Sequence, residues 1–208
     1  MEVSLENISK RFGYQWIVRA CNYHFPPGSI SGISGMNGSG KSTLIKIISS
    51  HLSPTEGKVK YKAGEKWVGN SDIYKYLSMV GPYTGLIGEY NIEEQYDFHF
   101  KFKKKSRDIK FEEFREWLEL DIHPTKRIMD YSSGMHQRLQ LGIALQTDVP
   151  LLLLDEPTSF LDNHAKDWFY RNLESMAANK TIIIASNDKE DFALCGKMYD
   201  VMELKAIS

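Results

Sequence analysis

The chain has 208 residues, with 26 Lys and Arg against 27 Asp and Glu, so its formal net charge at pH 7 is −1. This balance excludes a surface built mainly to coat nucleic acid, and we expect no nucleic-acid partner. A hydrophobic content of 42% excludes a largely disordered chain, and the length of 208 residues predicts one domain, or one domain with an insert. The two cysteines, Cys21 and Cys195, are too few for a disulfide framework and suit the cytoplasm.

The first part of the sequence carries signals for short strands and one helix. Val3 and Leu5 alternate with polar residues, which is typical of a strand, and a second strand is expected to end near Gly35. Apolar residues at helical spacing then predict a helix over 43–50. A turn at 53–57 precedes another short strand.

From about Pro82 to Leu145 the pattern becomes mostly helical. Asn91 followed by Glu94 fits a capping arrangement, in which the Asn oxygen accepts from a helix amide. The aromatic residues at 96–102 also alternate with polar ones, so the sequence leaves a strand open there.

Two bounded apolar runs, 149–154 and 182–185, are typical of strands buried on both faces. Strands that alternate with helices predict an α/β fold, in which a mostly parallel sheet is flanked by helices. We expect a single domain spanning the chain, with a core at 1–81 and 146–208 and a helical subdomain at about 82–145.

Residues 35–42 read Gly-Met-Asn-Gly-Ser-Gly-Lys-Ser, the pattern of a phosphate-binding loop. Its glycines let phosphate oxygens approach the backbone amides, and the following helix adds its positive end. Lys41 supplies a charge for the β- and γ-phosphates, and the Ser42 hydroxyl is a hard ligand for Mg²⁺. The alternative is a glycine-rich turn that binds nothing. The candidate nucleotide-binding residues here are Gly35, Met36, Asn37, Gly38, Ser39, Gly40, Lys41, Ser42 and Thr43.

An acidic pair, Asp155 and Glu156, follows the apolar run 151–154. Ligands of open α/β sheets bind at the carboxyl ends of the strands, so both carboxylates are candidate site residues. Asp155 is expected to hold Mg²⁺, and Glu156 is expected to polarise an attacking water. An ordinary end of a strand with two solvated acids is the alternative.

A third motif completes a resemblance to a known family. Residues 131–138 read Tyr-Ser-Ser-Gly-Met-His-Gln-Arg, and residues 159–162 read Ser-Phe-Leu-Asp. With the two motifs above, they make the chain resemble the ATP-binding subunit of ABC transporters, in an exporter-type, ABC-2-like form. The resemblance covers essentially the whole chain. It implies a P-loop NTPase core, an N-terminal antiparallel β part and an inserted helical subdomain.

The resemblance implies further nucleotide contacts and partners. Ser132, Ser133 and Gly134 would contact ATP bound to a second subunit, although Ser132 also suits a helix cap. Asp162 fits the loop that follows the acidic pair and would be a further nucleotide-binding residue. Phe12 matches an aromatic that stacks on adenine, and a core aromatic is its alternative. The implied cofactors are ATP and Mg²⁺, and the implied partners are a second ATP-binding subunit, in a homodimer or heterodimer, and an integral membrane permease on whose cytoplasmic face the chain would sit.

Two positions depart from the family pattern. Pro82 stands where a glutamine is usual, and Asn187 stands where a histidine is usual. Asn187 can donate a hydrogen bond to a γ-phosphate but cannot carry a charge. We therefore expect a slow ATPase, with Glu156, Lys41 and Asn187 as its catalytic residues. A nucleotide-gated regulatory module with little hydrolysis is the alternative, and a soluble ABC protein of translation or repair fits less well.

Two further features of the middle segment have open interpretations. A basic run over 101–107 would face either lipid headgroups or solvent. A set of aromatic residues would either pack in the helical core or line a groove for the membrane subunit. These aromatic residues are Tyr83, Tyr90, Tyr96, Phe98, Phe100 and Phe102.

Overall fold

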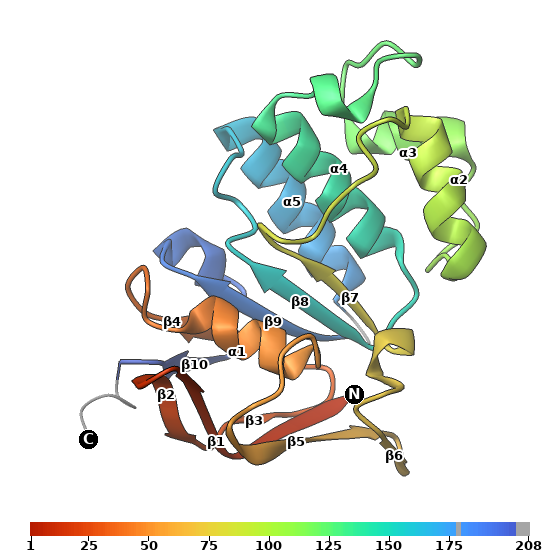
Figure 1. The fold of residues 1–208 in the computed structure, drawn as a ribbon. Coiled ribbons are helices and arrows are strands. Elements are labelled where there is room, and N and C mark those ends of the chain that lie inside the picture. The colour runs from red at the N-terminus through yellow and green to blue at the C-terminus, as the bar shows by residue number, and fades with distance from the viewer. Residues whose placement is uncertain (178–179, 203–208) are drawn as a thin grey trace. The chain divides into compact units, whose positions relative to one another are not determined.

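We describe the fold from a computed structural model of the chain, which describes residues 1–177 and 180–202. These residues form two compact units (Figure 1). The first unit contains both sheets and consists of Met1–Gly81, Val149–Pro157 and the described residues from Met176 onward. The second, helical unit consists of Pro82–Asp148 and Thr158–Ser175.

The first sheet is antiparallel, with the strand order β2-β1-β5-β6 and with β3 paired to β1. Its inner face is apolar because Val3 and Leu5 of β1 are buried opposite Tyr61 and Val59 of β5. This sheet is the predicted N-terminal β part. Its strands are β1 (Glu2–Phe12), β2 (Gln15–Cys21), β3 (His24–Phe25), β5 (Glu56–Ala63) and β6 (Lys66–Val68).

The second sheet is parallel throughout, with the order β10-β4-β9-β8-β7. Its central strands β8 and β9 are buried along their whole length, as the apolar runs predicted. Helix α1 (Lys41–Ile48) follows β4 and contacts β8 and β9. The strands are β4 (Ile30–Ser34), β7 (Leu77–Val80), β8 (Leu151–Asp155), β9 (Thr181–Ser186) and β10 (Lys197–Asp200).

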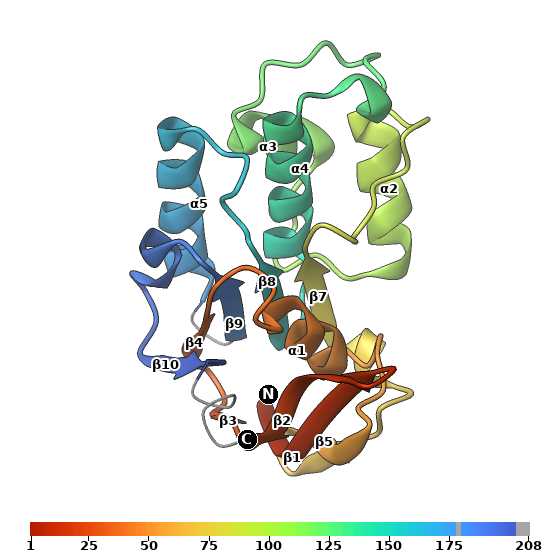
Figure 2. The ribbon, with the colours of Figure 1, turned by 60° about the vertical axis from the view of Figure 1, so that its left-hand side comes forward.

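The helical unit contains four α-helices, of which α3 and α4 lie side by side (Figure 2). They are α2 (Ile92–Phe102), α3 (Phe111–Leu118), α4 (Ser133–Gln146) and α5 (Asn163–Met176). The described chain also has three short 3₁₀ helices, of which η2 (Ile128–Asp130) lies in the helical unit and η1 (Ile73–Lys75) and η3 (Lys189–Phe192) lie in the first unit. No described helix is long and apolar enough to cross a bilayer.

Helix α2 resolves the ambiguity over residues 96–102. Asn91 accepts from the Glu94 amide at 2.9 Å, and the Glu94 carboxylate accepts from the Asn91 amide at 2.8 Å. This capping box satisfies two amides at the start of the helix, so the predicted cap is confirmed and the strand alternative is wrong.

The aromatic residues of α2 divide between the core and the surface. Tyr96 is buried and its hydroxyl donates to the Ile109 carbonyl, so it packs in the helical core. Phe98 and Phe102, in contrast, are 41% and 72% exposed, and their rings lie 5.4 Å apart. Lys105 of the basic run places its ammonium 4.7 Å from the centre of the Tyr96 ring.

The two units divide the chain differently from the expected core and subdomain, because residues 158–175 cluster with the helices rather than with the sheets. The reason is a tryptophan contact. Trp168 of α5 lies 5.1 Å from the Trp117 ring, and its indole N–H donates to the Trp117 carbonyl at 2.8 Å. Asn172 in turn accepts from the Trp117 indole at 2.7 Å. These contacts attach α5 to α3.

We expect Gly57→Ala to destabilise the first unit by about 2–4 kcal/mol. Gly57 has a φ of 83°, and an added Cβ would lie 2.4 Å from the carbonyl oxygens of Glu6 and Asn7. Gly64→Ala is the matched control, because Gly64 has a similar φ of 60° but no atom within 4 Å of the added Cβ. Urea unfolding measures both. Equal losses of about 1 kcal/mol would mean that the β1–β5 contact adapts to the methyl group.

Candidate nucleotide site

Parallel strand pairing brings three of the predicted motifs together. Ser34 at the end of β4 pairs with Ser186 at the end of β9, and Asp155 at the end of β8 pairs with Ala185. The carboxyl ends of these three neighbouring strands therefore meet at one edge of the sheet. The phosphate loop, the acidic pair and Asn187 each follow one of these ends.

The phosphate loop has the backbone that its glycines predicted. Gly35, Gly38 and Gly40 have φ values of 153°, 76° and 113°, in the region that favours glycine. A Cβ on Gly40 would also lie 2.9 Å from Ile17 and Val18 side chains of the neighbouring hairpin. The loop thus keeps its backbone free of side chains where an anion must approach the amides.

A pocket of about 430 Å³ lies over this loop. Phe12 is 52% exposed and lines the pocket, which contradicts its alternative role as a core aromatic. An apolar wall beside a glycine-rich loop suits a ligand that combines a flat base with phosphates. The lining residues are Phe12, Ile17, Asn37, Gly38, Ser39, Gly40, Lys41, Ser42, Thr43 and Glu156.

The side chain of Lys41 is only 5% exposed and is held by its own loop. Its ammonium donates to the carbonyls of Gly35 at 2.8 Å and Met36 at 3.3 Å. It also lies 3.4 Å from the Glu156 carboxylate. Phosphate oxygens are stronger acceptors than carbonyls, so the lysine is placed to transfer its hydrogen bonds to a nucleotide.

Glu156 has the left-handed backbone φ of 51°, which costs a non-glycine residue about 1 kcal/mol or more. Its carboxylate accepts from the Ser186 hydroxyl at 3.1 Å and from the main-chain amide of Asn187 at 3.4 Å. These contacts tie the acidic pair to the end of β9. Sequence reasoning did not find Ser186, because a serine at a strand end carries no motif.

Asn187 contacts the phosphate loop directly, since its side-chain amide donates to the Asn37 side chain at 3.1 Å. The residue that replaces the usual histidine therefore lies against the loop, with a donor to offer a ligand. Pro82 begins the helical unit. Gln95 is a glutamine farther along this unit that could in principle replace the one missing at position 82. It is buried, and its side-chain oxygen accepts from the Ile87 main-chain amide at 2.9 Å, so that oxygen already has a partner.

The donors available for a metal are oxygens. Asp155 is buried at the end of β8, and Ser42 follows Lys41 in the first turn of α1. Among the described residues no three His, Cys, Asp or Glu side chains form a metal-binding group. One carboxylate and one hydroxyl fit Mg²⁺, which binds through few protein ligands together with water and substrate phosphates.

The remaining predicted site residues belong to the helical unit. Ser132 caps α4, because its hydroxyl accepts from the Met135 amide at 3.3 Å, and Ser133 is the first residue of that helix. The Asp162 carboxylate caps α5 by accepting from the Ala165 amide at 2.8 Å. A Cβ on Gly134 would lie 2.8 Å from the Phe160 carbonyl oxygen. The two motifs therefore pack against each other.

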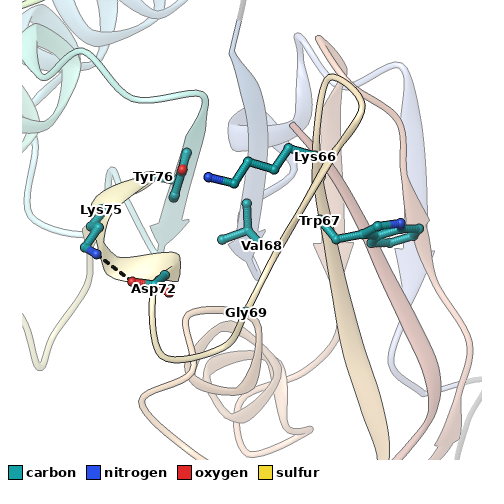
Figure 3. A pocket seen from close by; sticks show the side chains of 7 residues that line it. All are labelled: Lys66, Trp67, Val68, Gly69, Asp72, Lys75 and Tyr76. Atoms are coloured by element: carbon teal, nitrogen blue, oxygen red, sulfur yellow. Dashed lines mark hydrogen bonds and ion pairs between the residues drawn. The ribbon is translucent and has the colours of Figure 1, made fainter.

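A second, smaller pocket lies beside β6 and η1 (Figure 3). Its volume of about 180 Å³ is less than half that of the pocket over the phosphate loop. Lys66 extends toward Tyr76, Trp67 turns away, and Asp72 pairs with Lys75 at 2.5 Å. None of the sequence motifs described above includes a residue of this pocket.

Comparison with known proteins supports the resemblance to ABC transporters. Residues 18–159 match the family described as ABC transporter. The chain is 30% identical to the Nod factor export ATP-binding protein I of Rhizobium johnstonii, with 94% of this chain and 65% of that protein covered. It therefore spans less than two thirds of that relative. It is also 29% identical to the uncharacterized ABC transporter ATP-binding protein YybJ of Bacillus subtilis, with 93% and 89% covered.

Among solved structures, the fold matches that of the ATP-binding cassette MJ0796, described as a dimer in a post-hydrolysis state bound to ADP and Pi. The TM-score is 0.80 at 23% sequence identity, with 95% of this chain and 93% of that chain covered. This likeness confirms the predicted P-loop NTPase fold. Since the family match covers more than half of the residues, and the three motifs stand in the expected order, this chain belongs to the ABC transporter family.

Proposed function

We propose that this chain binds and hydrolyses ATP and thereby energises a membrane transporter, through ATP-dependent pairing with a second ATP-binding subunit. The observation that carries the proposal is the convergence of Lys41, Glu156 and Asn187 at one sheet edge, beside a pocket lined by Phe12. The family membership supports it independently.

In this proposal different residues of the first unit bind different parts of the nucleotide. Phe12 stacks on the base, and the amides of 35–43 together with Lys41 bind the phosphates. Ser42 and Asp155 hold Mg²⁺, which supplies positive charge beside the phosphates when bound. The buried position of Lys41 strengthens its attraction for phosphate, because a site with little water screens charge poorly.

Hydrolysis in this proposal depends on Glu156 and Asn187. The Glu156 carboxylate orients the attacking water and accepts its proton. Asn187 donates one neutral hydrogen bond to the γ-phosphate, where a histidine could offer a charged one. Pro82 has no side-chain acceptor for the water or the metal. The rate is therefore lower than that of a site with both usual residues.

The proposed partners follow from the family and from the two capped helices. Ser132–Gly134 and Asp162 lie in the helical unit, and we propose that they contact ATP on a second subunit. An integral permease would hold the pair on the cytoplasmic face of the membrane. The name of the Rhizobium relative refers to Nod factor export, which supports an exporter for this chain.

A nucleotide-gated module with little hydrolysis is the second candidate function. It is favoured by Pro82 and Asn187, which replace the two side chains that usually act on the γ-phosphate and water. The variants below distinguish it from a slow ATPase.

We expect Lys41→Ala to weaken ATP binding about 10- to 100-fold, because charged hydrogen bonds contribute about 1.5–3 kcal/mol. Lys66→Ala is the matched control, since this exposed lysine lies in the same unit but lines the smaller pocket. Calorimetric titration with ATP measures both variants. A similar loss in the two variants would place ATP outside the pocket over the phosphate loop.

We expect Glu156→Gln to bind ATP but to hydrolyse it at least about 100-fold more slowly, because glutamine keeps the shape and cannot accept a proton. Single-turnover hydrolysis in the assembled complex is the measurement. Glu174→Gln, at an exposed position of α5, is the control. If the wild-type complex binds ATP without hydrolysing it, the nucleotide-gated module is the correct function.

We expect Asn187→Ala to reduce the turnover rate about 2- to 10-fold, in line with one neutral hydrogen bond. Asn187→His should raise turnover and should add a titration near pH 6.5, because a protonated imidazole is the better donor. The gain is present below that pKa and is lost as the pH rises through it. Turnover measured from pH 5.5 to 8 tests this, and an unchanged rate in Asn187→Ala would exclude the proposed contact.

A further inference from the structure

The carboxylate of Glu119 lies near two arginines and one histidine in the helical unit. Its Oε2 lies 2.9 Å from Arg138 Nη2 and 3.6 Å from His164 Nε2, and its Oε1 lies 3.6 Å from Arg171 Nη2. Glu119 ends α3, Arg138 belongs to α4, and the other two residues belong to α5. One carboxylate thus connects three helices.

Arg138 is the buried member of this group. Its side chain is 6% exposed, and its guanidinium lies 4.8 Å from the centre of the Trp168 ring. Burial lowers the pKa of Arg138, and the charges of Glu119 and Asp162 oppose that shift. A buried guanidinium is tolerated only where a carboxylate pairs with it, so the position of Arg138 depends on Glu119.

Glu119 is also the residue at which α3 ends. Its φ of 49° is the left-handed conformation common at helix ends, and its main-chain amide donates to the Glu116 carbonyl at 3.0 Å. The end of α3 is therefore tied through the Glu119 carboxylate to side chains of α4 and α5.

Arg138 lies on the face of α4 that also carries Gly134, because residues four apart in a helix share a face. At Gly134 this face meets the Phe160 carbonyl, and at Arg138 it meets Trp168. Phe160 lies two residues before Asp162, which caps α5, and Trp168 lies in α5 itself. Helix α4 therefore contacts residues 160–168 at two positions, Gly134 and Arg138, and Glu119 holds the side chain of Arg138.

We propose that Glu119 is a positioning residue for ATP hydrolysis, which fixes Ser132–Gly134 relative to Asp162 by holding Arg138 in place. This inference rests on the proposed function, in which these residues contact ATP on the second subunit. A displacement of about 1 Å in residues that position a substrate can cost about 100-fold in rate. Glu119 itself touches neither ATP nor the attacking water.

The test compares Glu119→Gln with Glu116→Gln in the full chain. Glu116 lies on the same helix, is exposed and has no ion pair among the described side chains, so it is a matched control. In Glu119→Gln we expect faster amide hydrogen exchange over 131–138 and a kcat at least about tenfold lower. The Kd for ATP should not change, because the phosphate loop lies in the other unit.

The outcomes separate the positioning role from general damage and from the proposed function. Exchange and kcat that stay the same in both variants would overturn the inference, and so would faster exchange with an unchanged kcat. If Glu119→Gln does not fold, Glu119→Asp takes its place, since it keeps the charge on a shorter side chain; a wild-type kcat there would also overturn it. A wild-type chain that binds no ATP contradicts the proposed function instead, while the exchange difference still reports on Glu119.

Discussion

The parallel pairing of β4, β9 and β8 is the constraint on which the nucleotide site depends. The three strands end in register, so loops that are far apart in the sequence begin at neighbouring points of one sheet edge. Glu156 contacts both Lys41 and the Asn187 main-chain amide, and the Asn187 side chain contacts the phosphate loop. A shift of one residue in either pairing would turn alternate side chains to the opposite face and would disperse the site.

In the helical unit the motif residues are positioned differently, by helix capping and by packing rather than by strand pairing. Ser132 and Asp162 each cap a helix, and the two capped ends pack against each other through Gly134 and Phe160. The side chains that cap the starts of these two helices are also ones that the family resemblance assigns to the nucleotide. Local structure and the proposed function therefore place the same demand on these positions.

The sequence predicted several of the elements and the motif residues, because each of these depends on a local pattern. The phosphate loop, the Asn91 cap and the two buried strands all have short signatures that the structure confirms. Two features had no such signature. The assignment of α5 to the helical unit depends on Trp168 meeting Trp117, and the pairing of Glu119 with Arg138 joins residues 19 apart. Tertiary contacts of this kind are not encoded by spacing.

The enclosed position of the Lys41 ammonium has a consequence for how nucleotide binding responds to the solvent. An exposed lysine attracts phosphate through water, and dissolved ions screen most of that attraction at distances beyond about 10 Å at ordinary ionic strength. Lys41 is instead held between two loop carbonyls and the Glu156 carboxylate, away from bulk water. In the proposed nucleotide site, the attraction of Lys41 for phosphate would therefore depend little on salt concentration, and its ordered side chain would lose little conformational entropy on binding.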